Sequence, residues 1–289
     1  MKSLMLVVSV LMTLHIYNDG MIPDPIPSPD PPRLRGIPPR PKHALTGSEF
    51  AHYTRDMTEP ERQQAALREL LRGNMPEFLR TLKSVQLSDC TNERDTTSAT
   101  IWVMPDYLAI GSDSAFLRIP LSFPVATEVA RAFGCILPTR KMVDAIYAQA
   151  SCQLKPQPMK PGPEMRSMAY FVEHQRKIEA QRLGRPLGEL VSGHKKDVVL
   201  TNRLFSKPDR IAIYGWHLPN SEPIQPLSTL HGARYVDYSH GIRLISQSTW
   251  FEGQVRSVFD LFEDPLHAAL LTDEGAVLRA KKLLHPGHI

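Results

Sequence analysis

The amino-acid sequence predicts an α+β fold, with an amino-terminal helical segment and a mixed or antiparallel sheet in the carboxy-terminal half. Helical patterns gather early in the body of the chain, and short strand-like runs dominate after Gly184. Helices and strands do not alternate in a regular βαβ order, as they would in an α/β protein. The clustering of the two kinds of element therefore predicts the fold class.

Composition excludes several classes of protein. The length of 289 residues is typical of two domains, although one large domain is possible. Hydrophobic residues make up 42% and charged residues 22%, which excludes a disordered chain, a collagen-like fibre and a polytopic membrane protein. The net charge of +4 comes without a dense basic patch, so no nucleic-acid partner is expected. Three cysteines are too few for a disulfide scaffold, so the fold must rest on a packed core.

Residues 1–20 have the pattern of a secretory signal peptide or a membrane anchor. Lys2 precedes an apolar run from Leu4 to Leu14, which is too short to span a bilayer comfortably. The alternative is a buried amino-terminal strand or helix. Export predicts a secreted or periplasmic protein that contacts the membrane only through this segment.

A proline-rich linker is expected to follow. Nine of the 26 prolines lie between Pro23 and Pro41. Such a stretch stays extended, so residues 21–43 are predicted to form a stiff spacer without fixed structure. The body is expected to comprise a helical and α+β region, residues 44–184, and a strand-rich region with the candidate site, residues 185–289. We expect the two regions to form one compact unit.

The body is predicted to open with two helices, followed by short strands. Thr58 and Glu61 have the spacing of a capping box, so a helix is expected to begin after Thr58 and to end at Gly73. A second, shorter helix is expected after Asn74 and Pro76. The next strand-like runs are residues 84–87, 99–104, 107–110 and 116–121.

Further helices and then mainly strands complete the prediction. The expected helices cover residues 125–133, 138–150, 163–183, 258–262 and 276–284. The expected strands cover residues 197–200, 210–214, 235–238 and 242–245. His240-Gly241 could then be a hairpin turn between strands, which would make His240 an ordinary turn residue.

Polar side chains concentrate at strand ends and glycine turns between residues 191 and 241. Rigid strands position such groups well, so we expect the functional site there. The candidate catalytic residues are His194, His217, His231, Asp237, Ser239 and His240. The candidate ligand-binding residues are Lys195, Lys196, Tyr214, Trp216, Tyr235 and Arg243.

Nucleophilic catalysis is one chemistry open to these residues. Ser239 or Cys135 would be the nucleophile, a histidine its base, and Asp237 the group that orients the base. Each residue also has a simpler interpretation. Cys135 has apolar neighbours and is expected to be a buried, inert thiol, and His217 shares the face of a strand with core residues.

Two further chemistries involve bound ions. The histidines with Asp197 or Asp237 could ligate zinc, but no H-E-x-x-H spacing supports this, and no metal is assigned. His194 with Lys195 and Lys196 could form an anion-binding corner, although a solvated basic loop explains the same residues. No P-loop, G-x-G-x-x-G or G-x-S-x-G string is present, so no cofactor is expected.

One short strip of the sequence resembles a known family. His231-Gly232 followed by Ser239-His240-Gly241-Ile242-Arg243-Leu244 is similar to the catalytic strip of the L,D-transpeptidases. In that family the string reads Ser-His-Gly-Cys-hydrophobic-Arg, and its cysteine attacks a peptidoglycan stem peptide. Here Ile242 follows Gly241 directly, so the cysteine position is absent, and the spacing from the upstream histidine is shorter. The family is therefore not assigned, and no activity is carried over from it.

These features favour an exported enzyme with hydrolytic or acyl-transfer chemistry at the cell envelope. His231 or His240 would be the base, Asp237 its partner, and Ser239 a nucleophile or hydrogen-bond donor. The expected partner is an envelope polymer or a small peptide or carbohydrate.

The alternative is a secreted binding module without catalysis. In that interpretation Tyr214, Trp216, Tyr235 and Tyr238 line a groove for a carbohydrate or peptide. Convergence of at least three polar side chains at one place would favour the enzyme.

Overall fold

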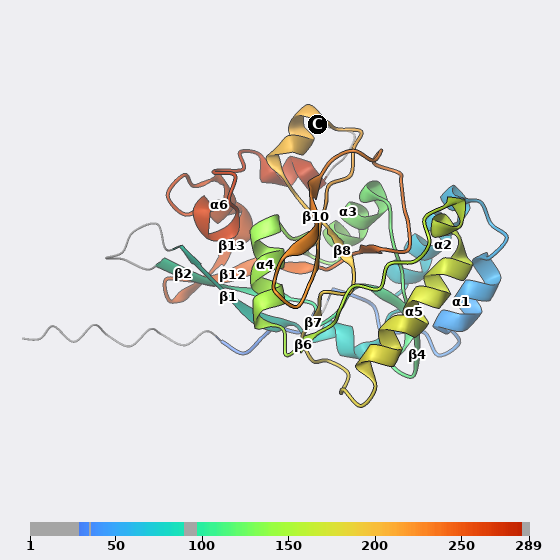
Figure 1. Ribbon diagram of the computed structural model, residues 1–289. Coiled ribbons are helices and arrows are strands. Elements are labelled where there is room, and N and C mark those ends of the chain that lie inside the picture. Colours follow the sequence, from blue (N-terminus) through green and yellow to red (C-terminus); the bar gives the residue numbers. More distant parts are fainter. Residues whose placement is uncertain (1–28, 35, 90–96, 285–289) are drawn as a thin grey trace, which may run out of the picture.

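The computed structural model describes residues 29–34, 36–89 and 97–284. It has the expected α+β fold, with helices early in the body and antiparallel and mixed sheets through the rest of the chain (Figure 1). The expected signal segment 1–20 and the first part of the expected linker, residues 21–28, lie outside the described residues. Among the helices that the structure describes, none is both long and apolar enough to cross a membrane.

The helices lie close to their expected positions. In the described part of the chain the α-helices are α1 (Gly47–Thr54), α2 (Glu59–Leu71), α3 (Phe123–Ala132), α4 (Arg140–Gln149), α5 (Met168–Arg182), α6 (Val258–Glu263) and α7 (Ala268–Leu271). The 3₁₀-helices are η1 (Glu77–Arg80), η2 (Pro163–Arg166), η3 (Asn202–Ser206) and η4 (Ala280–Leu284). The capping box before α2 is confirmed, because the Glu61 carboxylate accepts a hydrogen bond from the Thr58 N–H at 2.8 Å.

The strands form two larger and two smaller sheets. In the same residues they are β1 (Lys83–Asp89), β2 (Thr97–Val103), β3 (Ala109–Ser112), β4 (Ala115–Arg118), β5 (Cys135–Ile136), β6 (Cys152–Gln153), β7 (Val191–Ser192), β8 (Lys196–Val198), β9 (Ile213–His217), β10 (Pro223–Ser228), β11 (His240–Gly241), β12 (Ile245–Phe251) and β13 (Gln254–Ser257). One sheet has the order β1-β2-β12-β13, with β5 also paired to β12, and the other has the order β10-β9-β8-β11. The pairs β3-β4 and β6-β7 complete the set.

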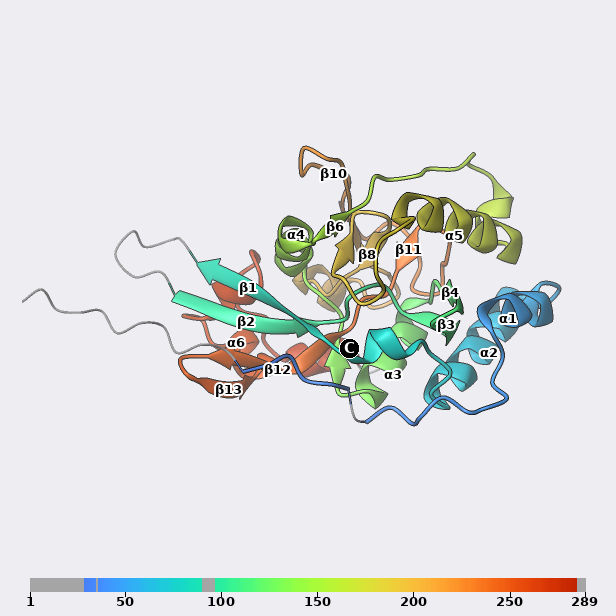
Figure 2. The same ribbon diagram turned by 90° about the horizontal axis from the view of Figure 1, so that it is seen from below.

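The core joins the two larger sheets. Helix α4 contacts both β1 and β9, so it lies between them. One cluster of buried apolar side chains includes Phe50 of α1, Ile101 of β2, Ile213 of β9 and Phe251 of β12. Figure 2 shows β1, β2, β12 and β13 toward one end of the molecule, α1 and α2 at the opposite end, and β8 and β11 beside α5.

The expectation that residues 21–43 lack fixed structure is wrong for those that the structure describes. Arg33 forms an isolated β-bridge with Thr81, and the N–H of Leu34 donates to the carbonyl of Arg80 at 2.8 Å. Ile37 is buried, and the Arg80 guanidinium donates to its carbonyl at 3.1 Å. Proline removes amide donors but leaves carbonyl acceptors. The body supplies the donors, so the extended segment is held along its surface.

The alternative of a hairpin turn at His240-Gly241 is also wrong. Residues 235–238 form no strand, and β11 pairs with β8 in parallel, with His240 opposite Lys196 and Gly241 opposite Asp197. The chain turns before Gly241, because the Asp237 side chain accepts a hydrogen bond from the Ser239 backbone N–H at 2.8 Å. His240 therefore lies inside a sheet.

The remaining differences are small. The expected helix 163–183 is η2 followed by α5, which begins after Ser167. The expected strands 210–214 and 242–245 lie about three residues earlier than β9 and β12. In place of the expected helix 276–284 the chain has only η4, and α7 was not expected.

Candidate functional site

The candidate site is built on the short parallel pair of β8 and β11. Register partners in a parallel pair point their side chains to the same side of the sheet, so Lys196 and His240 share one face. Strand β9 pairs with the other edge of β8. These pairings bring together three segments that the sequence separates, residues 191–198, 213–217 and 231–241.

Asp237 and His240 form the centre of this face. The Asp237 carboxylate accepts from the N–H and hydroxyl of Ser239, at 2.8 and 2.6 Å, and from the hydroxyl of Tyr235 at 3.1 Å. His240 Nε2 lies 3.9 Å from the same carboxylate. His240 is only 1% exposed, and neither of its ring nitrogens has a hydrogen-bond partner.

Both side chains are deprotonated near neutral pH, and they differ in charge. Burial lowers the pKa of His240 to about 4, so the imidazole is neutral. Burial raises the pKa of Asp237, but the adjacent His240 and the hydrogen bonds from Ser239 outweigh that effect and lower it. The pair therefore consists of a neutral, unpartnered base beside a carboxylate.

The buried amine of Lys195 interacts electrostatically with both Asp237 and His240. Its Nζ donates to the carbonyl of Tyr238 at 2.6 Å and lies 3.4 Å from Nδ1 of His174. Burial, with the charge of Arg118, lowers the pKa of Lys195 to about 7. Burial is also the largest cause of the lowered pKa of His174, which is therefore neutral.

Trp216 has a strained backbone. Its φ is +61°, in the left-handed region that bulky residues rarely adopt. Of the four non-glycine residues with positive φ in the described chain, Trp216 alone lies in a strand. Its ring contacts Lys196, whose Nζ is 5.1 Å from the centroid, and the rings of His174 and Tyr238. Such strain persists only where the surroundings enforce it, and it is concentrated at functional sites.

A buried ion pair lies next to His194. Arg118 donates to both oxygens of Asp106, at 2.9 and 2.6 Å, and its third nitrogen pairs with Glu179 at 2.6 Å. His194 Nε2 lies 3.1 Å from Asp106. Burial lowers the pKa of His194 to about 4, so this contact is a hydrogen bond from a neutral imidazole. Burial would raise the pKa of Asp106, but Arg118 holds it well below the usual value.

A second buried group lies on the other face of the β8–β11 pair. Tyr107 donates its hydroxyl proton to Asp197 at 2.7 Å, and the Arg243 guanidinium lies 4.4 Å from the Tyr107 ring centroid. Burial raises the pKa of Asp197 to about 6. A Cβ at Gly241 would come within 2.6 Å of the Tyr107 ring, so glycine is required there by close packing.

Buried polar atoms without a partner gather in this cluster. Twelve buried side-chain nitrogens and oxygens of the described residues lack a hydrogen-bond partner. Seven of the twelve belong to His174, His194, Asp197, Trp216, His240 (both ring nitrogens) and Arg243. Each such atom costs about 1–3 kcal/mol. Their concentration in one place is typical of a functional site.

Two of the candidate histidines lie apart from Asp237. His217 Nε2 contacts the Asp144 carboxylate at 2.9 Å, and its ring stacks on Tyr147 with centroids 4.5 Å apart. His231 is half-buried and stacks on Tyr235, with centroids 4.0 Å apart. The structure therefore brings together Asp237, Ser239 and His240 but not all four predicted histidines.

The aromatic candidates do not line an open groove. Tyr214, Trp216 and Tyr238 are buried, and Tyr235 alone among the four is half-buried. Tyr214 donates its hydroxyl proton to Asp144 at 2.9 Å, on the side of β9 that contacts α4.

Cys135 is a buried free thiol, as expected. Burial raises its pKa to about 12, which suppresses the thiolate. We expect alkylation of Cys135 by iodoacetamide in the folded protein to be at least about 100-fold slower than in the unfolded chain. Mass spectrometry of timed samples measures this rate, and fast modification of the native protein would contradict it.

Several residues of the cluster were not predicted. Asp106 and Arg118 carry no sequence signal, because each lies alone among apolar neighbours. His174 was detectable: it follows Phe171 by three residues and precedes Ile178 by four, so it shares the buried face of α5. Among the described residues, no group of three or more His, Cys, Asp or Glu side chains could hold a metal ion.

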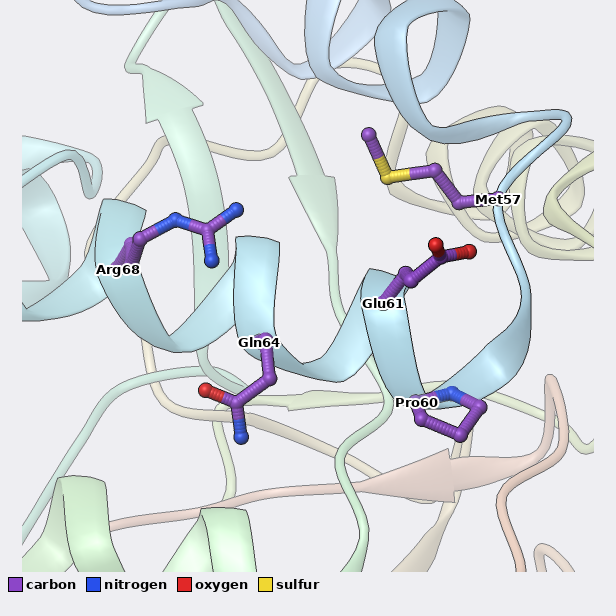
Figure 3. A pocket seen from close by; sticks show the side chains of 5 residues that line it. All are labelled: Met57, Pro60, Glu61, Gln64 and Arg68. Atoms are coloured by element: carbon purple, nitrogen blue, oxygen red, sulfur yellow. The ribbon is translucent and has the colours of Figure 1, made fainter.

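The outer side of α2 carries a separate groove. It has a volume of about 390 Å³ and is lined by Met57, Pro60, Glu61, Gln64 and Arg68 (Figure 3). None of these residues belongs to the buried cluster around His240.

The comparisons with known proteins identify no relative. No protein-family model matches the chain, and no match was found among curated proteins or solved structures. The short resemblance to the L,D-transpeptidases therefore has no support beyond the strip itself.

Proposed function

We propose that this chain is an exported enzyme that hydrolyses an acyl bond, or transfers the acyl group, at the cell envelope. The observation that carries this proposal is the neutral, buried and unpartnered imidazole of His240 beside the fixed carboxylate of Asp237. A base in this state can accept a proton, and the adjacent carboxylate stabilises the imidazolium that forms.

In the proposed step a water molecule attacks the acyl carbonyl carbon. As the new C–O bond forms, His240 removes a proton from the water, and the carbonyl electrons move to the carbonyl oxygen. The intermediate then collapses, the bond to the leaving group breaks, and the leaving group takes the proton from His240. An alcohol or amine in place of water gives acyl transfer by the same route.

The other residues of the cluster support this step. Ser239 donates its hydroxyl proton to Asp237, at 2.6 Å, so it acts as a positioning residue and not as the nucleophile. The Lys195 ammonium, fixed by the Tyr238 carbonyl, opposes the negative charge that develops on the substrate. Burial strengthens both effects because the local dielectric is low.

The proposed export rests on the sequence of residues 1–20, and the envelope substrate rests on that export. The binding-module alternative is the outcome expected if no acyl substrate reacts. It would require the aromatic cluster to open, because three of its four rings are buried.

The pH dependence of hydrolysis tests this proposal. His240 must be neutral, so kcat/KM should rise with pH through about 4, the pKa of its imidazole. Lys195 must be charged, so activity should fall as pH rises through about 7. The expected profile is a bell, measured on 4-nitrophenyl acetate and on peptidoglycan.

The Lys195→Met variant tests the alkaline side of the pH profile. It should lower the maximum rate of hydrolysis and remove the decrease in activity as pH rises through about 7. A rate that only increases with pH, as hydroxide attack does, would contradict the proposal.

A further inference from the structure

One part of the cluster lies beyond the acid–base pair and is composed only of hydrogen-bond donors. Lys196 is half-buried, and its ammonium lies over the Trp216 ring. Trp216 is 5% exposed, and its indole Nε1–H has no partner. His174 is fully buried, and its Nε2 also has no partner.

The proton of His174 can be placed by its neighbour. Lys195 Nζ is a donor, so His174 Nδ1, 3.4 Å away, accepts and the imidazole proton resides on Nε2. All three groups therefore present N–H bonds, and none of these three polar atoms is an acceptor. The ring of His174 lies next to Trp216, with centroids 6.4 Å apart.

The charges of the cluster favour a single negative charge on the ligand. Arg118 and Arg182 together balance Asp106 and Glu179, and Arg243 lies 3.9 Å from Asp197. Asp237 is the carboxylate that acts on both Lys195 and Lys196. Two lysines against one carboxylate leave at most one positive charge for a ligand to neutralise, which fits a carboxylate better than a phosphate dianion.

We propose that Lys196, Trp216 and His174 form a subsite for a free carboxylate on the acyl substrate. Lys196 is the register partner of His240 on the next strand, so the two side chains leave the same face of the sheet from strands about 5 Å apart. The substrate is therefore a peptide or acylated amino acid whose free carboxylate is close to the bond that breaks. The claim that this substrate reacts rests on the proposed function, whereas the claim that its carboxylate binds here does not.

The strain at Trp216 supports the same assignment independently. At a φ of +61° Trp216 leaves the extended conformation, and its indole lies beside Lys196 and His174. Gly215 precedes it with φ +103°, so two consecutive residues of β9 leave the extended conformation at this point. A binding role explains why the chain holds an aromatic residue where glycine would be unstrained.

Calorimetry on the full chain tests the subsite with two probes, N-acetyl-Ala-Ala and its carboxy-terminal amide. We expect the free acid to bind at least about 10-fold more tightly than the amide, as one charge-assisted hydrogen bond provides. Lys196→Gln should reduce this ratio toward one. Trp216→Phe keeps an aromatic ring but removes the indole N–H, and should reduce the ratio by about threefold. Lys42→Gln, at an exposed lysine, should retain the parent ratio.

Three results would overturn the subsite: equal binding of the two probes, no binding of either, or a Lys196→Gln variant that keeps the parent ratio with an unchanged melting temperature. Tighter binding of inorganic phosphate than of the free acid would also overturn the carboxylate assignment. Hydrolysis of neutral esters without a preference for the free acid would leave the proposed function standing alone. Binding of the free acid without hydrolysis would leave the subsite standing alone.

Discussion

Replacing His240 by alanine is expected to lower kcat/KM for ester hydrolysis by about 10²–10⁴-fold, the contribution of a positioned general base. The imidazole is the group of the cluster that combines a lowered pKa, complete burial and two unpartnered nitrogens. Asp237→Asn should also lower the rate, by about 10²-fold, because it removes the charge that stabilises the imidazolium. Rates on 4-nitrophenyl acetate and peptidoglycan, with thermal melts of each variant, measure both effects.

The chain contains a matched control for this experiment. His267 and Asp264 have the same three-residue spacing as His240 and Asp237, and their side chains hydrogen-bond at 2.6 Å, but His267 is partly exposed. His267→Ala should leave the rate unchanged. His231→Ala should have only a small effect, because His231 contacts the Tyr235 ring and not Asp237. If His240→Ala keeps full activity, or only lowers stability by the 1–3 kcal/mol of a lost buried polar contact, the catalytic assignment is wrong.

Most of the fold was predictable because its signals are local. The capping box at Thr58 and Glu61 identified α2, and short runs of β-branched and aromatic residues bounded by turn residues identified β1 and β2. The alternative of a hairpin at His240-Gly241 was wrong because glycine is a turn signal in sequence. Here the Tyr107 ring packs so closely on Gly241 that only glycine fits. The prediction for the described part of the proline-rich segment was wrong because its carbonyls accept hydrogen bonds from Arg80, which is more than 40 residues away in the sequence.

The candidate site was predictable where its residues come from one short segment. Asp237, Ser239 and His240 were grouped because two of their contacts span only two or three residues. The parallel pairing of His240 with Lys196 was not predictable, because it joins segments 44 residues apart through a register that no turn specifies. The carboxylate next to His194 was missed for the same reason, since Asp106 is 88 residues away.

Replacing Arg118 by methionine is expected to lower the free energy of unfolding by about 3–5 kcal/mol. The substitution leaves Asp106 buried at 1% exposure with its carboxylate held only by His194 and a backbone N–H. The matched control is Arg256→Met, which breaks the exposed pair with Glu252 and should cost less than about 1 kcal/mol. Urea unfolding at pH 7 measures both values.

The pH dependence of this loss has a definite sign. Arg118 holds the pKa of Asp106 well below 3.8 in the folded protein, so the unfolded chain binds the extra proton first as pH falls. The stability from the pair is complete above the unfolded pKa and is lost as pH falls toward the folded one. The difference in stability between the parent and Arg118→Met should therefore be largest near neutral pH and should shrink below about pH 4.

The double variant Asp106→Leu with Arg118→Met separates stability from function. Removing both charges of a buried pair is often neutral or stabilising, so the double variant should recover most of the loss of the single one. His194 would lose its partner at 3.1 Å, and Lys195 would lose both the charge of Arg118, which lowers its pKa, and the smaller opposing effect of Asp106. We therefore expect a stable protein whose upper pH limb of hydrolysis moves to higher pH. A double variant as unstable as Arg118→Met would contradict the expected recovery of stability, and an upper pH limb that does not move would show that the pair does not act on Lys195.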